Sequence, residues 1–180
     1  YPRLEGDKGY ELSKKYMPEG SCGVISFALE GGREAAEKVM KVADEISPDV
    51  ILSIGQAGGR GAVTPELVGI NLRHATIPDN NGNQPKDEPI AEGGSAAYFS
   101  TLPVREMSEA IKAVGLPSAV SYSAGAYVCN DLLYSLLEHF DRSETKVAFI
   151  HIPYSTEQGK QPSMELEDIV RGLIAAIECI

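Results

Sequence analysis

Long apolar runs and clusters of basic residues are both missing from this 180-residue sequence. No apolar stretch approaches the roughly 20 residues that a membrane-spanning helix needs. The formal net charge is −10, and no run of lysine and arginine is longer than a pair. Since nucleic acids and anionic membrane surfaces are bound through basic patches, the composition argues against both as partners.

Cysteine is scarce as well, because only Cys22, Cys129 and Cys179 are present. The three are widely spaced, form no CxxC pair, and follow no secretory-type apolar segment. An odd, dispersed set of cysteines is typical of free thiols in a reducing compartment. We therefore expect a cytoplasmic protein in which a thiol can stay free.

Internal repeats, linkers and low-complexity tracts are also absent, and the length suits a single domain over residues 1–180 with a substantial core. Strand-like and helix-like stretches alternate along the chain. The predicted strands are residues 24–29, 49–55, 118–122 and 146–153. The predicted helices are residues 33–46, 103–114, 128–137 and 163–177, the last capped by Ser163. This alternation predicts a three-layer α/β/α sandwich around a mostly parallel, mixed sheet.

Cys129 stands in SYSAGAYVCNDLLY, within the first turn of the helix expected after Gly125. Unpaired backbone N–H groups and the helix dipole stabilise a thiolate there, and can bring its pKa to about 3.5–7.5. The same N–H groups could hold an oxyanion. A free cysteine beside Val128 on a helix is, however, commonly a small core residue. The local pattern favours burial and leaves the role of nucleophile open.

His151 follows VAFI near the carboxyl end of a predicted strand, at the edge of an α/β sheet where sites gather. A histidine there could accept a thiol proton while a carboxylate orients its ring. A satisfied, half-buried imidazole is an equally good interpretation. His74, in a polar loop, and His139, near a helix end, are weaker candidates.

The local sequence also allows predictions for two loops and one acidic residue. IGQAGGR lacks both the GxGxxG spacing and the Walker GK[ST] ending, so it favours close approach to a small ligand over nucleotide binding. Residues 71–97 form a long irregular stretch, which predicts a functional surface loop. Glu66 follows Thr64 and Pro65 in TPELVGIN, a plausible helix start, where the pattern predicts a solvated first-turn acid.

Seven segments, in order from about residue 48 to the end, resemble the pyroglutamyl peptidase I family, the pyrrolidone-carboxylate peptidases of the cysteine type. The segments are LSIGQAGGR, TPELVGIN, IPDNNGNQP, AAYFSTLP, SAGAYVCNDLLY, FIHIP and QPSMELEDIV. The SAGxYVCN element is highly specific. The resemblance implies a phosphorylase/hydrolase-like sandwich and an omega-peptidase that removes N-terminal pyroglutamyl groups from small peptides.

The resemblance also implies roles for individual residues. It makes Cys129 the nucleophile, His151 the general base and Glu66 the acid that orients the histidine. The residues implied to hold the lactam ring are Gln56, Ile77, Tyr127 and Val128. No metal or organic cofactor is required, and a homo-oligomer, a dimer or tetramer, is implied.

Two departures from the family pattern concern the pocket. Thr76 stands where the family usually carries an arginine that helps to stabilise the oxyanion, and Arg73 or Arg60 could compensate. The family also begins with a strand and a Gly/Phe-rich loop over the lactam, which this sequence does not contain. We expect either that residues 1–20 replace that element or that the natural polypeptide begins earlier.

Two other functions therefore stay open at this point. One is a catalytically impaired homologue that binds pyroglutamyl or lactam ligands without efficient turnover, which Thr76 motivates. The other is a nucleoside- or phosphate-handling protein on a related sandwich, although no phosphate loop supports it.

Overall fold

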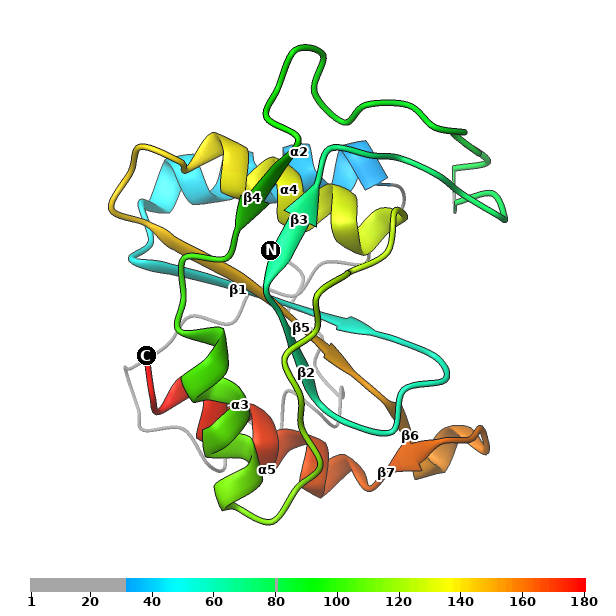
Figure 1. Ribbon diagram of the computed structural model, residues 1–180, viewed down its shortest axis with the longest axis vertical. Coiled ribbons are helices and arrows are strands. Elements are labelled where there is room, and N and C mark those ends of the chain that lie inside the picture. Colours follow the sequence, from blue (N-terminus) through cyan, green and yellow to red (C-terminus); the bar gives the residue numbers. More distant parts are fainter. Residues whose placement is uncertain (1–31, 80) are drawn as a thin grey trace.

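The computed structural model describes residues 32–79 and 81–180 (Figure 1). Cys22, the strand predicted at residues 24–29 and the expected replacement of the Gly/Phe-rich loop lie outside these residues. The helices are α2 (Gly32–Ile46), α3 (Val104–Ala113), α4 (Val128–His139) and α5 (Leu166–Ile177). The strands are β1 (Val50–Gln56), β2 (Thr64–Glu66), β3 (Val68–Ile70), β4 (Ala97–Phe99), β5 (Lys146–Ile152), β6 (Tyr154–Ser155) and β7 (Ser163–Met164). A short 3₁₀ helix, η1 (Thr156–Gln158), follows β6.

The central sheet of the described residues has the strand order β1-β5-β2. Strand β1 runs parallel to β5, with Gly55 opposite His151, and β2 runs antiparallel to β5, with Thr64 opposite His151. Two smaller pairs, antiparallel β3-β4 and parallel β6-β7, flank it. The sheet is therefore mixed, as the alternation of elements predicts.

Helices cover both faces of this sheet (Figure 1). Alternate residues of β5 enter different cores, because side chains of a strand point to opposite faces. Val147 and Phe149 pack with residues of α2 and α4, whereas Ala148 and Ile150 pack with residues of α3 and α5. This is the predicted three-layer α/β/α arrangement. None of the helices in the described ranges is long and apolar enough to cross a membrane.

Residues 118–122, predicted as a strand, form only isolated bridges beside β2. Ser118 pairs with Val63 and Ser121 with Glu66. The ladder cannot continue between these bridges, because β2 is three residues long and Pro65 at its centre has no N–H to donate. The prediction of a full strand is therefore wrong, although the segment runs alongside the sheet.

Two predicted helix starts are also wrong. Thr64 and Pro65 lie in strand β2, because the residue before a proline is disfavoured in the helical region and β5 offers an extended partner. Ser163 does not cap the last helix, since it pairs with Tyr154 in the β6-β7 ladder. Helix α5 begins at Leu166, with Glu165 at its N-cap.

Candidate active site

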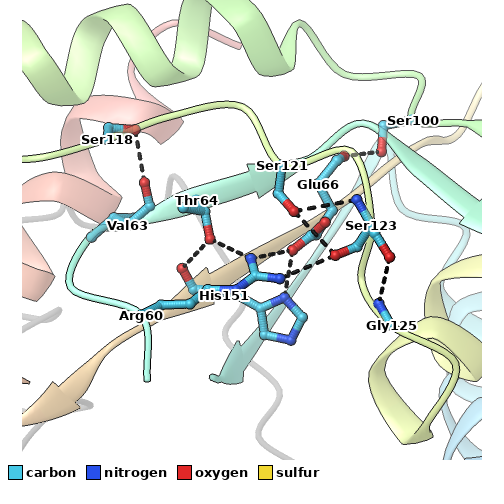
Figure 2. Close-up of polar contacts among 10 residues, drawn as sticks. All are labelled: Arg60, Val63, Thr64, Glu66, Ser100, Ser118, Ser121, Ser123, Gly125 and His151. Atoms are coloured by element: carbon cyan, nitrogen blue, oxygen red, sulfur yellow. Dashed lines mark hydrogen bonds and ion pairs between the residues drawn. The ribbon is translucent and has the colours of Figure 1, made fainter. Parts of the chain in front are cut away.

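A buried acid and histidine pair lies where β2 meets β5 (Figure 2). Nδ1 of His151 is 2.6 Å from Oε1 of Glu66, and the two side chains are 5% and 0% exposed. Thr64 faces His151 and Glu66 faces Phe149 across the strand pair, which puts these four side chains on one face of the sheet. The solvated acid predicted from local pattern is thus a fully buried partner of the histidine.

Arg60, in the loop between β1 and β2, reaches the same carboxylate (Figure 2). Its Nη1 lies 2.6 Å from Oε1 of Glu66 and 2.7 Å from Oγ1 of Thr64. Its Nη2 donates to the carbonyl oxygen of Ser123 over 3.1 Å. Sequence reasoning did not assign Arg60 to this acid, although a buried carboxylate generally requires a cation nearby.

The charge of Glu66 is maintained by these neighbours. Burial by itself raises the pKa of Glu66, but its contacts with His151, Ser121 and Arg60 together lower the pKa below the ordinary value. Oε2 of the carboxylate is buried and has no hydrogen-bond partner within the described part of the chain. Oε1 therefore carries the contacts that keep the group ionised.

Cys129 is the second residue of α4, in the first turn where the sequence predicts it. A Cβ atom added to Gly55 of β1 would lie 3.2 Å from Sγ of Cys129. Gly55 is the register partner of His151, and the His151 ring lies 4.8 Å from the Phe149 ring, centroid to centroid. The thiol thus packs over the end of β1, beside the strand position that holds the histidine.

The thiol of Cys129 is not activated in the way the helix start predicts. Burial raises its pKa to about 11; the Glu66 carboxylate adds to this effect and Arg60 opposes it. Within residues 32–79 and 81–180, no hydrogen bond joins Sγ to His151. Desolvation outweighs the helix dipole here, so the free thiol is the resting form.

The start of α4 also provides backbone donors. The first hydrogen bond of the helix runs from the N–H of Asp131 to the carbonyl of Tyr127, over 3.0 Å. The N–H groups of Val128, Cys129 and Asn130 therefore precede the helical ladder. Such groups next to a nucleophile are suited to hold an oxyanion.

Arg73 and Arg60, the expected substitutes for an arginine at position 76, are both engaged in other contacts. Arg73 forms two hydrogen bonds with Asp131, of which Nη2 to Oδ1 is 3.0 Å, and Arg60 is bound to the buried acid. Thr76 itself is exposed, and its carbonyl oxygen accepts a hydrogen bond from Gln84 over 3.0 Å. Compensation by either arginine would require breaking these contacts.

Three of the predicted lactam residues lie around one junction. The hydroxyl of Tyr127 donates to the carbonyl of Pro78 over 2.9 Å, which ties the residue before α4 to the loop that carries Ile77. Ile77 is 64% exposed and Val128 is half-buried. An apolar surface is therefore available next to the cysteine.

Gln56, the fourth predicted lactam residue, is the last residue of β1 and is exposed. Its amide exchanges two hydrogen bonds with that of Gln158 in η1, of 2.7 and 3.2 Å. Oε1 of Gln158 also accepts from the N–H of Ser155 over 2.9 Å. Gln158 was not predicted, because nothing in its local sequence relates it to a residue about a hundred positions away.

The side chains of the two other histidines each contact a carboxylate other than Glu66. His74 pairs with Asp87 over 2.9 Å and His139 with Asp44 over 2.8 Å. In the part of the chain that the structure describes, no group of three or more histidine, cysteine, aspartate or glutamate side chains converges as a metal site.

A thiol at a helix start, near a buried carboxylate and histidine pair at the carboxyl end of an α/β sheet, is typical of thiol hydrolases. The family model described as pyroglutamyl peptidase matches residues 26–180. The chain therefore belongs to the pyroglutamyl peptidase family.

Individual relatives agree with this assignment. A pyrrolidone-carboxylate peptidase of Levilactobacillus brevis is 51% identical over 176 residues, which cover 92% of this chain and 86% of that protein. The pyrrolidone-carboxylate peptidase of Lactobacillus helveticus is 45% identical over 172 residues, 91% of this chain and 86% of that protein. The crystal structure of pyroglutamyl peptidase I from Bacillus amyloliquefaciens superposes with a TM-score of 0.85 at 41% identity, covering 94% of this chain and 86% of that one.

Proposed function

We propose that this chain is a cysteine-type omega-peptidase that hydrolyses the amide bond after an N-terminal pyroglutamyl group of small peptides. The observation that carries the proposal is the fully buried Glu66 bonded to His151 on the sheet face over which Cys129 packs. Membership of the family supports the choice of substrate.

In this proposal Sγ of Cys129 attacks the pyroglutamyl carbonyl carbon. Nε2 of His151 takes the thiol proton, because Nδ1 faces Glu66. The backbone N–H groups at the start of α4 hold the oxyanion until the C–N bond breaks and the histidine protonates the leaving amine. Water, with its proton taken by the same nitrogen, then hydrolyses the thioester, which releases pyroglutamate and restores the thiol.

The pKa of about 11 for Cys129 favours proton transfer during attack over a preformed thiolate. A thiol with a raised pKa gives up its proton more readily as the S–C bond forms and charge moves to the carbonyl oxygen. The helix start then stabilises a charge that appears on substrate oxygen, rather than one that already resides on sulfur.

Recognition of the substrate is assigned to Gln56, Ile77, Tyr127 and Val128. A lactam is a small, flat, uncharged ring, so an apolar surface with few amide contacts can bind it. An open-chain residue with a charged α-amino group would be poorly solvated against the same surface. This difference would select pyroglutamyl over ordinary N-termini.

The same family membership supports three further expectations, namely a single domain over residues 1–180, a cytoplasmic location, and a homo-oligomer, either dimer or tetramer. Size-exclusion chromatography with light scattering measures the number of subunits. A monomer at all concentrations would contradict the third expectation.

A second candidate is a homologue that binds pyroglutamyl or lactam ligands with little turnover. Two observations favour it: Thr76 stands in place of the family arginine, and within the described ranges Sγ of Cys129 has no hydrogen bond to His151. Loss of one oxyanion donor typically costs about 10²–10³ in rate.

Hydrolysis of pyroglutamyl-coumarylamide under reducing conditions tests the leading proposal. We expect turnover by the wild-type protein, none by Cys129→Ala, and none with prolyl-coumarylamide as the ring control. Calorimetric binding of a pyroglutamyl peptide without turnover would favour the second candidate. A folded wild-type protein that neither binds nor cleaves would contradict both.

A further inference from the structure

Arg60 joins strand β2 to the segment that leads into α4 (Figure 2). Its guanidinium contacts Glu66 and Thr64 of β2, and the carbonyl of Ser123 in the segment that leads into α4. We propose that Arg60 is a positioning residue for the proposed reaction, which neutralises the buried carboxylate and holds the acid and histidine pair in register with the start of the Cys129 helix.

The geometry of the bonds supports a positioning role. Arg60 and His151 share one oxygen of Glu66, Oε1, and both contacts measure 2.6 Å. The arginine side chain is 29% exposed while the carboxylate is 0% exposed, so the guanidinium reaches inward from the surface. The nitrogen that contacts Oε1, Nη1, also donates to Oγ1 of Thr64, and the other nitrogen, Nη2, donates to the carbonyl of Ser123; these two bonds fix the direction from which Oε1 is contacted.

The residues after Ser123 connect the segment that Arg60 holds to the helix that contains Cys129. Oγ of Ser123 accepts the N–H of Gly125 over 3.1 Å, and Gly125 has a φ of +81° that turns the chain towards α4. A glycine suits this backbone conformation because other residues are strained there. The guanidinium is therefore linked through one short turn to the helix that presents Cys129.

The charges of the site depend on the same residue. The titratable and charged groups that face Glu66 are His151 from β5, Arg60 from the β1–β2 loop and Cys129 from α4, with Tyr127 beside the cysteine. Arg60 lowers the pKa of Glu66 and that of Cys129. Without Arg60, the buried carboxylate would keep only part of its stabilisation and would take up a proton at higher pH, and the thiol would lose its proton at higher pH.

If the contact between Arg60 and Glu66 were purely structural, its loss would lower stability and would reduce activity by the same factor at every pH. A positioning residue that neutralises the acid predicts a displaced pH profile instead. The variants Arg60→Gln and Arg60→Lys separate these cases, and Arg171→Gln is the control, because Arg171 pairs with Asp168 on the surface over 2.9 Å.

The first measurement is kcat/KM for pyroglutamyl-coumarylamide between pH 5 and 9. In Arg60→Gln we expect the acidic limb of the pH profile of kcat/KM to move to higher pH by about one unit, with KM nearly unchanged. Arg60→Lys keeps the positive charge but lacks the two-nitrogen fork of the guanidinium. The acidic limb of its pH profile should therefore stay at the wild-type position while kcat falls about tenfold. Arg171→Gln superimposes on the wild type.

The second measurement does not depend on peptidase activity, and so separates failure of this inference from failure of the proposed function. Iodoacetamide alkylation of Cys129 is followed against pH by mass spectrometry. In Arg60→Gln the rate at pH 8 should fall about threefold, because loss of the guanidinium raises the pKa of the thiol and lowers the thiolate fraction.

An unchanged acidic limb in Arg60→Gln, or an equal loss of rate at every pH, would overturn the inference. So would an alkylation profile identical to that of the wild type. Should Arg60→Gln fail to fold, Arg60→Lys decides alone, and either unchanged kcat or a displaced limb in that variant would overturn the inference.

Discussion

Gly55 lies against both Cys129 and Phe149, and the Phe149 ring leaves no room for a side chain at position 55. A Cβ atom there would be 3.2 Å from Sγ of Cys129 and 2.6 Å from Cζ of Phe149. The thiol therefore rests against the backbone of β1. Its position relative to the histidine depends on the glycine at position 55, because a glycine within a strand allows another element to approach closely.

Replacing Gly55 with alanine should displace the Phe149 ring and the cysteine together. We expect a loss of about 1–3 kcal/mol in stability from overpacking, and a larger loss in kcat than in KM. Chemical denaturation and steady-state kinetics measure the two effects. Gly61→Ala is the control, since a Cβ there meets Pro162 only at an ordinary 3.4 Å; equal behaviour of the two variants would contradict this account.

Alkylation of the wild-type protein without substrate should be slow at neutral pH. The pKa of Cys129 is raised to about 11, so the thiolate fraction and the labelling rate should increase about tenfold per pH unit through pH 8 to 10. Iodoacetamide labelling mapped to Cys129 checks this. Fast labelling at pH 6 would instead show the thiolate that the helix start alone predicts.

Stability at low pH should depend on Glu66. Its pKa is lower in the folded protein than the ordinary 4.5, so the carboxylate contributes stability above the unfolded pKa and this contribution disappears as pH falls through the folded pKa. Glu66→Gln should be less stable than the wild type by about 1.5–3 kcal/mol at pH 7, and the difference should shrink below pH 4.5. A difference that stays constant between pH 7 and pH 3 would be inconsistent with the lowered pKa.

Removal of the Gln158 amide should affect substrate binding through Gln56. Gln158→Leu leaves the Gln56 amide without the partner that fixes its direction, so we expect KM to rise about threefold to tenfold with a small change in kcat. Gln161→Leu is the control, because Gln161 bonds only to the hydroxyl of Ser163 among the described side chains. Equal KM values for the two variants would show that Gln56 is positioned without this contact.

An arginine at position 76, where the resemblance to the family implies one, should raise the rate. In Thr76→Arg the added guanidinium supplies an oxyanion donor, and the loop backbone remains held by the Gln84 side chain, so kcat should increase by up to about 10²-fold. Comparison with Thr76→Lys and Thr76→Gln distinguishes a directed donor from a general effect of charge or length. An unchanged kcat in Thr76→Arg would mean that the backbone N–H groups at the start of α4 already stabilise the oxyanion sufficiently.

The elements that the sequence predicts well are those with a local signal. Apolar periodicity predicts α3 and α4, and the continuous apolar run at residues 49–55 predicts β1. Strand β2 was missed, because its extended state depends on pairing with β5, whose residues lie about 85 positions further along the chain. The same holds for Ser163, whose partner Tyr154 draws it into a strand.

The candidate site divides in the same way. Cys129 and His151 could be proposed from their positions at element ends, whereas Glu66 came only from the resemblance to a family. Arg60 was considered only as a substitute oxyanion donor and Gln158 was not considered, since their contacts with Glu66 and Gln56 exist only once the sheet has folded. The sign of the Cys129 pKa shift could not be predicted either, because burial depends on how Gly55 lets the helix approach the sheet.

The most direct test of the central claim is to trap the acyl intermediate. Protein mixed with excess pyroglutamyl-coumarylamide is quenched in acid within the first turnover, digested and mapped by mass spectrometry. We expect one pyroglutamyl group as a thioester on the peptide that contains Cys129, and none in Cys129→Ala. Turnover without any such adduct, or an adduct on Cys22 or Cys179 instead, would contradict the claim.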